Sequence, residues 1–351
     1  MPLKEFEITT TKIPTYWVGL LKVKGSYAQD DFEVPLATYE KPVAYTVERG
    51  CRATYNHGIT TLLEDKGWAR APVLKGQSAQ HLNEVVTYIT ENFNQLKQTA
   101  NETTKYGQLD KIEPQIVGRH LYLRINMQNG DAAGHNMTTK AAQAIIDEII
   151  SKFPELKLIA ISGNYCTDKK VSAINSITGR GKKVIAETII TDEDCRRILK
   201  TTPQAIQEIN NIKNYKGSII AGSICSANAH YANMLYAIYT ATGQDGANIV
   251  EGSQGISDAE ITEQGDLYFA VTIPNIIVGT VKSNNFGEDQ KNNLIRIGCY
   301  GSGKPIGTNA KKLAEIITAT VLAGELNLLA VLSKNKELVL SHEKIERTQL
   351  K

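Results

Sequence analysis

The sequence predicts a mixed fold of the α/β or α+β class, because segments with strand-like and helix-like apolar spacing alternate along the chain. Its 351 residues are enough for one large domain or two of ordinary size. Residues 72–160 follow the order helix, strand, helix, strand, which is typical of a self-contained unit. Residues 216–243 are apolar on nearly all sides, as expected of a helix buried inside a large domain.

In the N-terminal half, residues 1–35 alternate short β-prone pieces with turns. Residues 79–98 carry apolar positions at helical spacing, and residues 119–127 alternate as a half-buried strand does. Asn136 can cap a helix that runs to about Phe153. The apolar face of that helix consists of Ala142, Ile145, Ile146, Ile149 and Ile150.

In the C-terminal half, residues 156–162, 182–190 and 267–274 are predicted strands, and residues 308–334 a long closing helix. No run of 18 uninterrupted apolar residues occurs, so we expect buried helices of a soluble protein and no membrane partner. The first 14 residues contain early acids and no apolar core, unlike a signal peptide.

The composition excludes several classes of protein. Hydrophobic residues make up 42% and charged residues 22%, which is neither a disordered nor a collagen-like composition. The net charge of +2 predicts no nucleic-acid-binding surface. The five cysteines lack CxxC pairs and metal-ligand spacing, so we expect a reduced cytosolic chain with no disulfides and no metal site.

A Gly-rich string, residues 298–304 (GCYGSGK), matches the GxxxxGK half of a phosphate loop. In such loops the backbone amides wrap a phosphate and the lysine neutralises its charge. Pro305 stands where a Ser or Thr hydroxyl should bind magnesium, and a Gly-rich surface turn explains the string just as well. The ordinary dinucleotide fingerprint GxGxxG after a strand is missing.

Residues 162–170 (SGNYCTDKK) place two lysines, an aspartate, an asparagine and a serine directly after an apolar strand. At a strand end such a cluster faces a crevice, where a lysine can polarise a carbonyl group and an aspartate can tune it. A solvated turn has the same composition, so both interpretations stay open on the residues alone.

Two further strings place polar residues at helix positions. Residues 130–136 (GDAAGHN) precede a helix N-terminus, where free amides and the helix dipole suit a pyrophosphate, although a simple Asn-capped helix start is the alternative. Residues 227–233 (ANAHYAN) put His230 and Asn233 on one face of the apolar helix, where either a ligand or core partners would satisfy them.

Taken together, these strings closely resemble the 3-hydroxy-3-methylglutaryl-CoA (HMG-CoA) reductases, in particular the class I enzymes. The resemblance spans about residues 15–345. Its strings are SGNYCTDKKVSAINSITGRGKKVIAE, GDAAGHNMTTKA, AGSICSANAHYANMLYAIYTATGQD, Glu40 within VPLATYEKP, Arg70 within WARAPV, AGELNLLA (323–330) and LVLSH (338–342).

The resemblance implies reduction of HMG-CoA to mevalonate and CoA with two successive hydrides from NADPH, or from NADH as the alternative donor. It implies an α+β fold in which a large domain (residues 1–70 and 161–351) surrounds a long buried central helix. A small ferredoxin-like NADP(H)-binding domain (residues 71–160) would be inserted. A cytoplasmic homodimer or tetramer is expected, with Glu40, Lys169 and Asp245 from one subunit and the cofactor domain from the other.

Four positions match the family's catalytic residues. Lys169 would stabilise the charge that the thioester carbonyl gains as hydride arrives, and Glu40 would supply the proton. Asp245 would link Glu40 and Lys169 electrostatically. His342 would protonate the CoA thiolate, and the polar segment after about Ser333 would fold over the site when the cofactor binds.

Other positions match the family's binding residues. Lys213 would pair with the free carboxylate of the substrate, and Lys105 with the 2′-phosphate of NADPH. The substrate-binding set is Arg49, Arg70, Ser162, Asn164, Asp168, Lys170, Lys213, His230 and Asn233, with Gln244 around the same pocket. The cofactor-binding set is Lys105, Asp131, Gly134, His135, Asn136 and Lys282.

The sequence also departs from the family pattern. GTVKSNN (279–285) replaces GTVGGGT, TYWVG (15–19) replaces the subunit-contact motif ENVIG, and Ala133 and His135 replace two methionines of the cofactor motif. Lys282 would either pair with the pyrophosphate or lie in a loop that has drifted outward.

These departures motivate two alternatives to an active HMG-CoA reductase. Glu48, which replaces an Asn in the CoA-side segment, and Tyr45 would suit a reductase that has drifted to another acyl-CoA. The loss of the glycines in GTVKSNN would suit a non-catalytic acyl-CoA-binding homologue.

Overall fold

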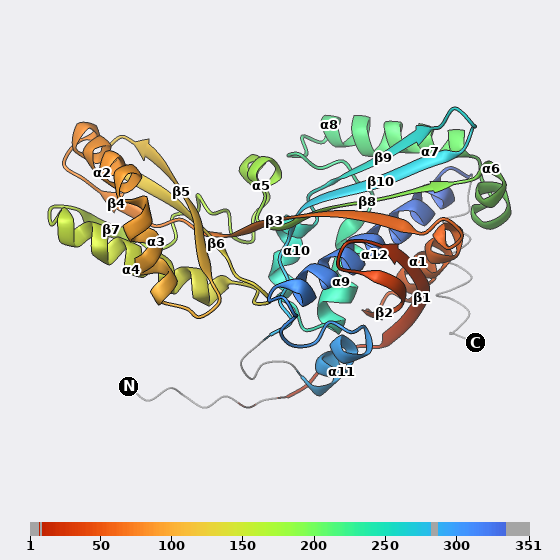
Figure 1. The fold of residues 1–351 in the computed structure, drawn as a ribbon. Coiled ribbons are helices and arrows are strands. Elements are labelled where there is room, and N and C mark those ends of the chain that lie inside the picture. The colour runs from red at the N-terminus through yellow and green to blue at the C-terminus, as the bar shows by residue number, and fades with distance from the viewer. Residues whose placement is uncertain (1–6, 8, 282–286, 335–351) are drawn as a thin grey trace.

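The computed structural model describes residues 7, 9–281 and 287–334, and it has two lobes joined by one continuous strand (Figure 1). That strand, β3 (Ile59–Arg70), pairs with β8 over residues 60–67 and with β6 over its last three residues. The chain is therefore a mixed α/β protein in which Arg70 ends the strand at the junction of the lobes.

The larger lobe has the strand order β3–β8–β10–β9, with the hairpin β1–β2 beside β3. Its strands are β1 (Thr15–Lys24), β2 (Gln29–Ala37), β8 (Gly181–Ile190), β9 (Ile256–Ile261) and β10 (Leu267–Ile276). Its helices are α1 (Lys41–Thr54), α5 (Ala173–Thr178), α6 (Asp192–Asp194), α7 (Pro203–Ile209), α8 (Ser218–Ile220), α9 (Tyr231–Ala241), α10 (Ile249–Gly252), α11 (Glu288–Arg296) and α12 (Thr308–Leu332), with π-helical turns at Cys195–Leu199 and Asn210–Gly217 and a 3-10 turn at Gly246–Asn248.

The smaller lobe has the strand order β7–β4–β6–β5, and every pair of neighbours is antiparallel. Figure 1 shows its helices gathered on one side of these strands. Its elements in chain order are β4 (Val73–Lys75), α2 (Ala79–Glu91), α3 (Phe93–Glu102), β5 (Gln108–Val117), β6 (His120–Gln128), α4 (His135–Lys152) and β7 (Lys157–Ala160). Its buried apolar side chains form a cluster separate from that of the larger lobe.

Helix α12 forms the centre of the larger core. It is long and apolar enough to cross a membrane by length and composition, but 89% of its most apolar 18-residue window is buried against the rest of the protein. It packs against α1, α9 and β8, as the core helix of a folded domain does.

The structure corrects three predictions about the helices. Residues 216–243 are not one helix, because Gly222 and Cys225 adopt left-handed backbone conformations and residue 227 bridges to β9; the helix begins only at Tyr231. The long buried helix is therefore α12. The helix predicted over 79–98 is broken at Asn92, and α4 is capped by Gly134 rather than by Asn136.

Candidate active site

A lysine–aspartate pair lies between the two lobes. Lys169 Nζ lies 2.7 Å from Asp245 Oδ2, and both side chains are partly exposed. Asp245 also caps the 3-10 turn that follows it, because its carboxylate accepts the N–H of Ala247 at 3.1 Å. Partial burial alone would raise the pKa of the Asp245 carboxyl, but the bonds from Lys169 and Ala247 outweigh this and lower the pKa. The Asp245 carboxyl is therefore ionised at neutral pH.

The loop that carries Lys169 has an unusual backbone. Asn164, Thr167 and Lys169 all have positive φ, at 64°, 50° and 55°. Such conformations cost non-glycine residues about 1–2 kcal/mol each and persist only where the surroundings impose them. The loop 162–170 is therefore built to hold its side chains in place, unlike an ordinary solvated turn.

Arg70 and Arg180 hold the aspartate next to this lysine. Arg70 donates to Ser162 Oγ at 3.2 Å and lies 3.5 Å from Asp168, whose other oxygen pairs with Arg180 at 2.9 Å. The two guanidinium groups stack on the ring of Trp68, at 4.5 and 4.1 Å. The sequence does not single out Trp68 or Arg180 as site residues, although both lie inside strings that carry the resemblance.

The cofactor-motif loop lies beside the lysine–aspartate pair in the same chain. His135, the first residue of α4, stacks on Trp68 at 4.8 Å, and its Nε2 lies 3.8 Å from Asp245 Oδ2. Burial lowers the pKa of the His135 imidazole, which is therefore neutral at pH 7. Gly134 must be glycine, because its φ is +103° and a Cβ would lie 2.3 Å from the Asn129 amide.

Asp131 uses its carboxylate inside the protein. It is 2% exposed, and its oxygens accept the backbone N–H groups of Gly303, Gly307 and Ala310 at 2.7–2.9 Å. The backbone N–H groups at the end of the phosphate-loop-like string therefore donate to an internal carboxylate and not to a phosphate. Any part that Asp131 plays in cofactor binding acts through the segment it holds.

We expect Asp131→Asn to lower the free energy of unfolding by about 3 kcal/mol, because an amide cannot accept these N–H groups as a carboxylate does. Urea unfolding measures this. Asp30→Asn is the matched control, since Asp30 is exposed and, in the part of the chain that the structure describes, accepts only the N–H of Asp31. Equal unfolding free energies for the two variants would contradict the role given to Asp131.

Two other segments lie next to the cofactor motif. The turn that holds Lys105 packs on the first turn of α4. Gly107 of this turn lies so close to the helix that a Cβ there would be 2.6 Å from the Met137 sulfur. Thr280 donates its N–H to the Asp131 carbonyl at 2.8 Å, and a Cβ on Gly279 would lie 2.5 Å from Ala133 N. Lys282 and its loop follow directly but lie outside the described residues.

Glu40 belongs to a different cluster within one chain. It precedes α1, is exposed, and has no hydrogen bond or ion pair with Lys169 or Asp245 among the described residues. Its carboxylate and the ammonium of Lys213 instead lie near enough to His230 to shift the pKa of that imidazole, upward and downward respectively. Burial lowers the pKa of the His230 imidazole, whose Nε2 lies 3.1 Å from the Gly324 carbonyl.

Helix α9 separates these two clusters. His230 directly precedes the first residue of α9, and Asp245 comes four residues after its last residue, Ala241. The 11 residues of the helix span about 16 Å between its two ends. Asn233 is exposed in the first turn of α9, near His230. Within one chain, Lys169 and Asp245 therefore lie beside the cofactor motif, and Glu40 lies apart from both. The resemblance instead groups Glu40 with Lys169 and Asp245 and places the cofactor domain in the other subunit.

The segment expected to face CoA has internal contacts. Arg49 donates to the carbonyl groups of Ile198 and Leu199 at 3.0 and 2.8 Å. Glu48 accepts the N–H of Gly19 at 3.0 Å, so its carboxylate is explained without a ligand. Glu48 therefore gives no support to a changed acyl-CoA preference.

The remaining predicted residues are less constrained. Asn164, Lys170 and Asn136 are exposed, and the Lys170 ammonium donates to the Asp168 carbonyl at 3.0 Å. Gln244 is buried and accepts the N–H of Gly279 at 2.9 Å. His342 and the closing segment lie outside the described residues, and within those residues no group of His, Cys, Asp and Glu could hold a metal ion.

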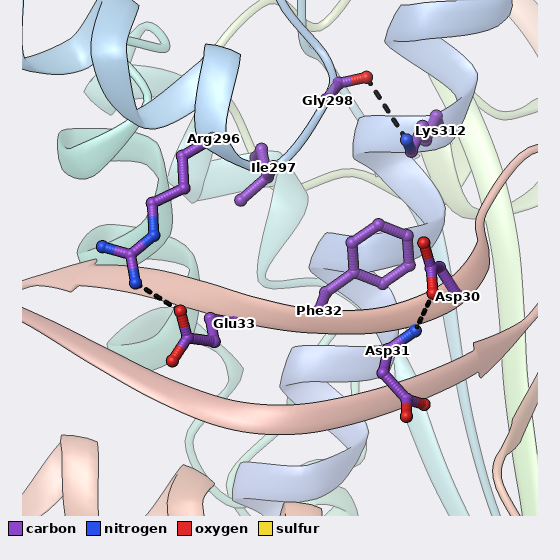
Figure 2. Close-up of a pocket in the computed structure, with 8 residues that line it drawn as sticks. All are labelled: Asp30, Asp31, Phe32, Glu33, Arg296, Ile297, Gly298 and Lys312. Carbon is purple, nitrogen blue, oxygen red and sulfur yellow. Dashed lines mark hydrogen bonds and ion pairs between the residues drawn. The ribbon is translucent and has the colours of Figure 1, made fainter.

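A pocket of about 280 Å³ lies away from this site, between β2 and the start of α12 (Figure 2). Figure 2 shows its cations already engaged: Arg296 pairs with Glu33, and Lys312 donates to the Gly298 carbonyl at 3.3 Å. None of the predicted site residues lines it.

Comparison with known proteins places this geometry in a family. Residues 3–347 match the family model described as hydroxymethylglutaryl-coenzyme A reductase. The 3-hydroxy-3-methylglutaryl-coenzyme A reductase of Methanocaldococcus jannaschii is 46% identical over 93% of this chain and 80% of its own length, and that of Pyrococcus abyssi is 44% identical over 97% and 83%. The class II enzyme of Streptococcus pneumoniae, solved with NADPH in open conformations, has the same fold with a TM-score of 0.72 at 20% identity, over 93% of this chain and 86% of that one.

Proposed function

Because this chain belongs to the hydroxymethylglutaryl-coenzyme A reductase family, we propose that Lys169 and Asp245 form the centre at which it reduces HMG-CoA. The enzyme converts HMG-CoA to mevalonate and CoA with NADPH as the reductant. The observation that carries the site assignment is the 2.7 Å ion pair between Lys169 and Asp245 at the cofactor motif.

Lys169 stabilises negative charge on the reacting oxygen. The thioester carbonyl and then the aldehyde carbonyl become anionic as they accept hydride, and a fixed ammonium group beside them lowers that barrier. Asp245 orients the Lys169 ammonium group through the 2.7 Å bond. The backbone of the loop 162–170 limits the positions that the ammonium group can take.

The residues around α4 fit a dinucleotide. Helix α4 has 18 residues and no side-chain cap among the described residues, and the first N–H groups of such a helix can donate to a phosphate. The His135 Nε2 is buried without a hydrogen-bond partner in the same part of the chain. When bound there, NADPH supplies the hydride. Gly134 would let the backbone approach the ligand, and neutral His135 would line the cofactor site beside Asp245.

Lys105 favours NADPH over NADH by pairing with the 2′-phosphate. We expect Lys105→Ala to raise the KM for NADPH about tenfold, since one charge-assisted hydrogen bond is lost, and to leave the KM for NADH unchanged. Steady-state kinetics with both donors measures this. Lys75→Ala serves as the control, because Lys75 is an exposed lysine of the same lobe. Equal shifts in the KM for NADPH and the KM for NADH would show that Lys105 does not bind the 2′-phosphate.

A second copy of the chain completes the site. Glu40, Lys213, His230 and Asn233 lie at the other end of α9 from Asp245, where they can serve the substrate held by a partner's Lys169. Arg70, Ser162, Asp168 and Lys170 act from the same chain as Lys169. We therefore assign a homo-oligomer, with a dimer as the smallest complete unit.

The smaller lobe supplies the cofactor domain. Its order β4, helices, β5, β6, α4, β7 with sheet order β7–β4–β6–β5 fits a ferredoxin-like unit inserted at residues 71–160 of a larger domain. A cytoplasmic location is part of the same proposal, as are proton donation by His342 and the contact of Lys282 with the pyrophosphate.

The experiment that tests this function compares acyl-CoA substrates. Purified protein is incubated with NADPH and HMG-CoA, acetoacetyl-CoA or acetyl-CoA, and the products are separated by chromatography. Mevalonate and CoA from HMG-CoA are expected. Preferred reduction of another acyl-CoA would mean a changed specificity, and binding of HMG-CoA without turnover would mean a non-catalytic homologue.

A further inference from the structure

The backbone of Lys169 is held by a buried glutamate from another part of the chain. The N–H of Lys169 donates to Glu251 Oε1 at 3.1 Å. Glu251 lies in α10, six residues after Asp245, and it is fully buried. One short segment therefore presents the carboxylate that pairs with the Lys169 ammonium group and the carboxylate that holds the Lys169 backbone.

Glu251 Oε1 is shared by three donors. Besides the Lys169 N–H, it accepts from Arg180 Nη1 at 2.8 Å and from Asn248 Nδ2 at 2.9 Å. Its other oxygen, Oε2, is buried without a partner among the described residues. The hydrogen bonds of this carboxylate therefore converge on Oε1, and one of them fixes the backbone of the reacting lysine.

Arg180 joins this carboxylate to the residue before Lys169. Its guanidinium is fully buried, with Nη1 on Glu251 and Nη2 on Asp168 at 2.9 Å, and it stacks on Trp68 at 4.1 Å. A planar guanidinium can hold two carboxylates at a fixed separation, which the single ammonium group of a lysine cannot do. Asp168 and Lys169 are consequently anchored on the same rigid group.

A buried ion pair of this kind is poorly explained by stability alone, because desolvation of both charges cancels most of its attraction. Glu251 of this ion pair also accepts the N–H of Lys169, whose backbone is strained, and this bond gives the pair a role at the site. We propose that Arg180 and Glu251 are positioning residues, which hold the Lys169 backbone in its left-handed conformation and so aim the ammonium group at the substrate carbonyl. This inference rests on the function proposed above.

The central variant is Glu251→Gln, which preserves shape and leaves one oxygen to accept hydrogen bonds. Without the charge, Arg180 turns toward Asp168 and the Lys169 loop relaxes. We expect kcat with HMG-CoA to fall about 10- to 100-fold, because a displacement of about 1 Å can cost this much. The KM for HMG-CoA and the Kd for CoA should stay within about twofold, since Glu251 touches neither.

Glu315→Gln is the control for a merely structural effect. Glu315 is also fully buried, its carboxylate accepts the N–H groups of Tyr27 and Ala28, and burial raises the pKa of both glutamates. None of its hydrogen bonds within residues 9–281 and 287–334 reaches a residue of the site. We expect both variants to lower Tm, and only Glu251→Gln to lower the kcat of the folded protein.

Arg180→Lys keeps the charge and removes the fork, so it should also lower kcat. It should raise KM as well, because Arg180 also holds Asp168 of the substrate-binding set. This variant replaces Glu251→Gln if that variant does not fold. A kcat equal to that of Glu315→Gln in either variant would overturn the inference. An inactive wild-type protein would instead overturn the proposed function, so the two failures are distinguishable.

Discussion

Replacing Lys169 with alanine is expected to abolish the reduction of HMG-CoA while leaving the fold and the affinity for CoA nearly intact. The ammonium group pairs with Asp245, whose carboxylate also lies 3.8 Å from His135 of the cofactor motif. Removing one such electrostatic donor from an active site costs about 10²-fold or more in rate. NADPH oxidation measures turnover, and calorimetry with CoA measures binding.

Lys183→Ala is the matched control for Lys169→Ala. Lys183 lies on β8 and pairs with Glu64 at 3.4 Å, away from the site. It should keep full activity, because a surface ion pair contributes little. A Lys169→Ala enzyme within a few-fold of the wild type would remove Lys169 from the chemistry.

The second large effect concerns the assembly. Glu40→Gln and Lys169→Ala should each be inactive alone, yet mixing the two proteins with subunit exchange should restore activity. In a mixed dimer one site has both variant residues and the other has neither. Random exchange would return about a quarter of the wild-type rate, since half of the dimers are mixed and one of their two sites is intact.

The double variant Glu40→Gln/Lys169→Ala provides the control for this experiment. Mixed with Lys169→Ala, it leaves no site with both residues intact, so no activity should return. If the two single variants also fail to restore activity although mixed dimers form, Glu40 and Lys169 serve the same site from one chain.

The chemistry-bearing strings could be identified from the sequence because their residues are close together in the chain. SGNYCTDKK indicated a candidate reactive lysine, and the family resemblance implied Lys169 and Asp245, which form an ion pair. The strands over 119–127, 182–190 and 267–274 and the closing helix were also predicted, because their apolar spacing is regular over many residues.

The supporting contacts could not be predicted because they join distant segments. Arg180 meets Glu251 across 71 positions, and Asp131 meets the 303–310 segment across more than 170. The phosphate-loop-like string shows the difficulty, since its pattern of free N–H groups suits any anion and the anion here is a side chain of the same chain. Likewise, nothing in the local apolar pattern of residues 216–243 revealed the break before Tyr231.

The two-step reduction of HMG-CoA is tested most directly by the ratio of NADPH oxidised to CoA released during complete conversion of HMG-CoA. CoA is quantified as free thiol and NADPH by its absorbance in the same reaction. We expect two molecules of NADPH for each CoA, because the thioester and the aldehyde are reduced in turn at the Lys169–Asp245 centre. A ratio of one, or CoA release without NADPH oxidation, would contradict this reaction at that centre.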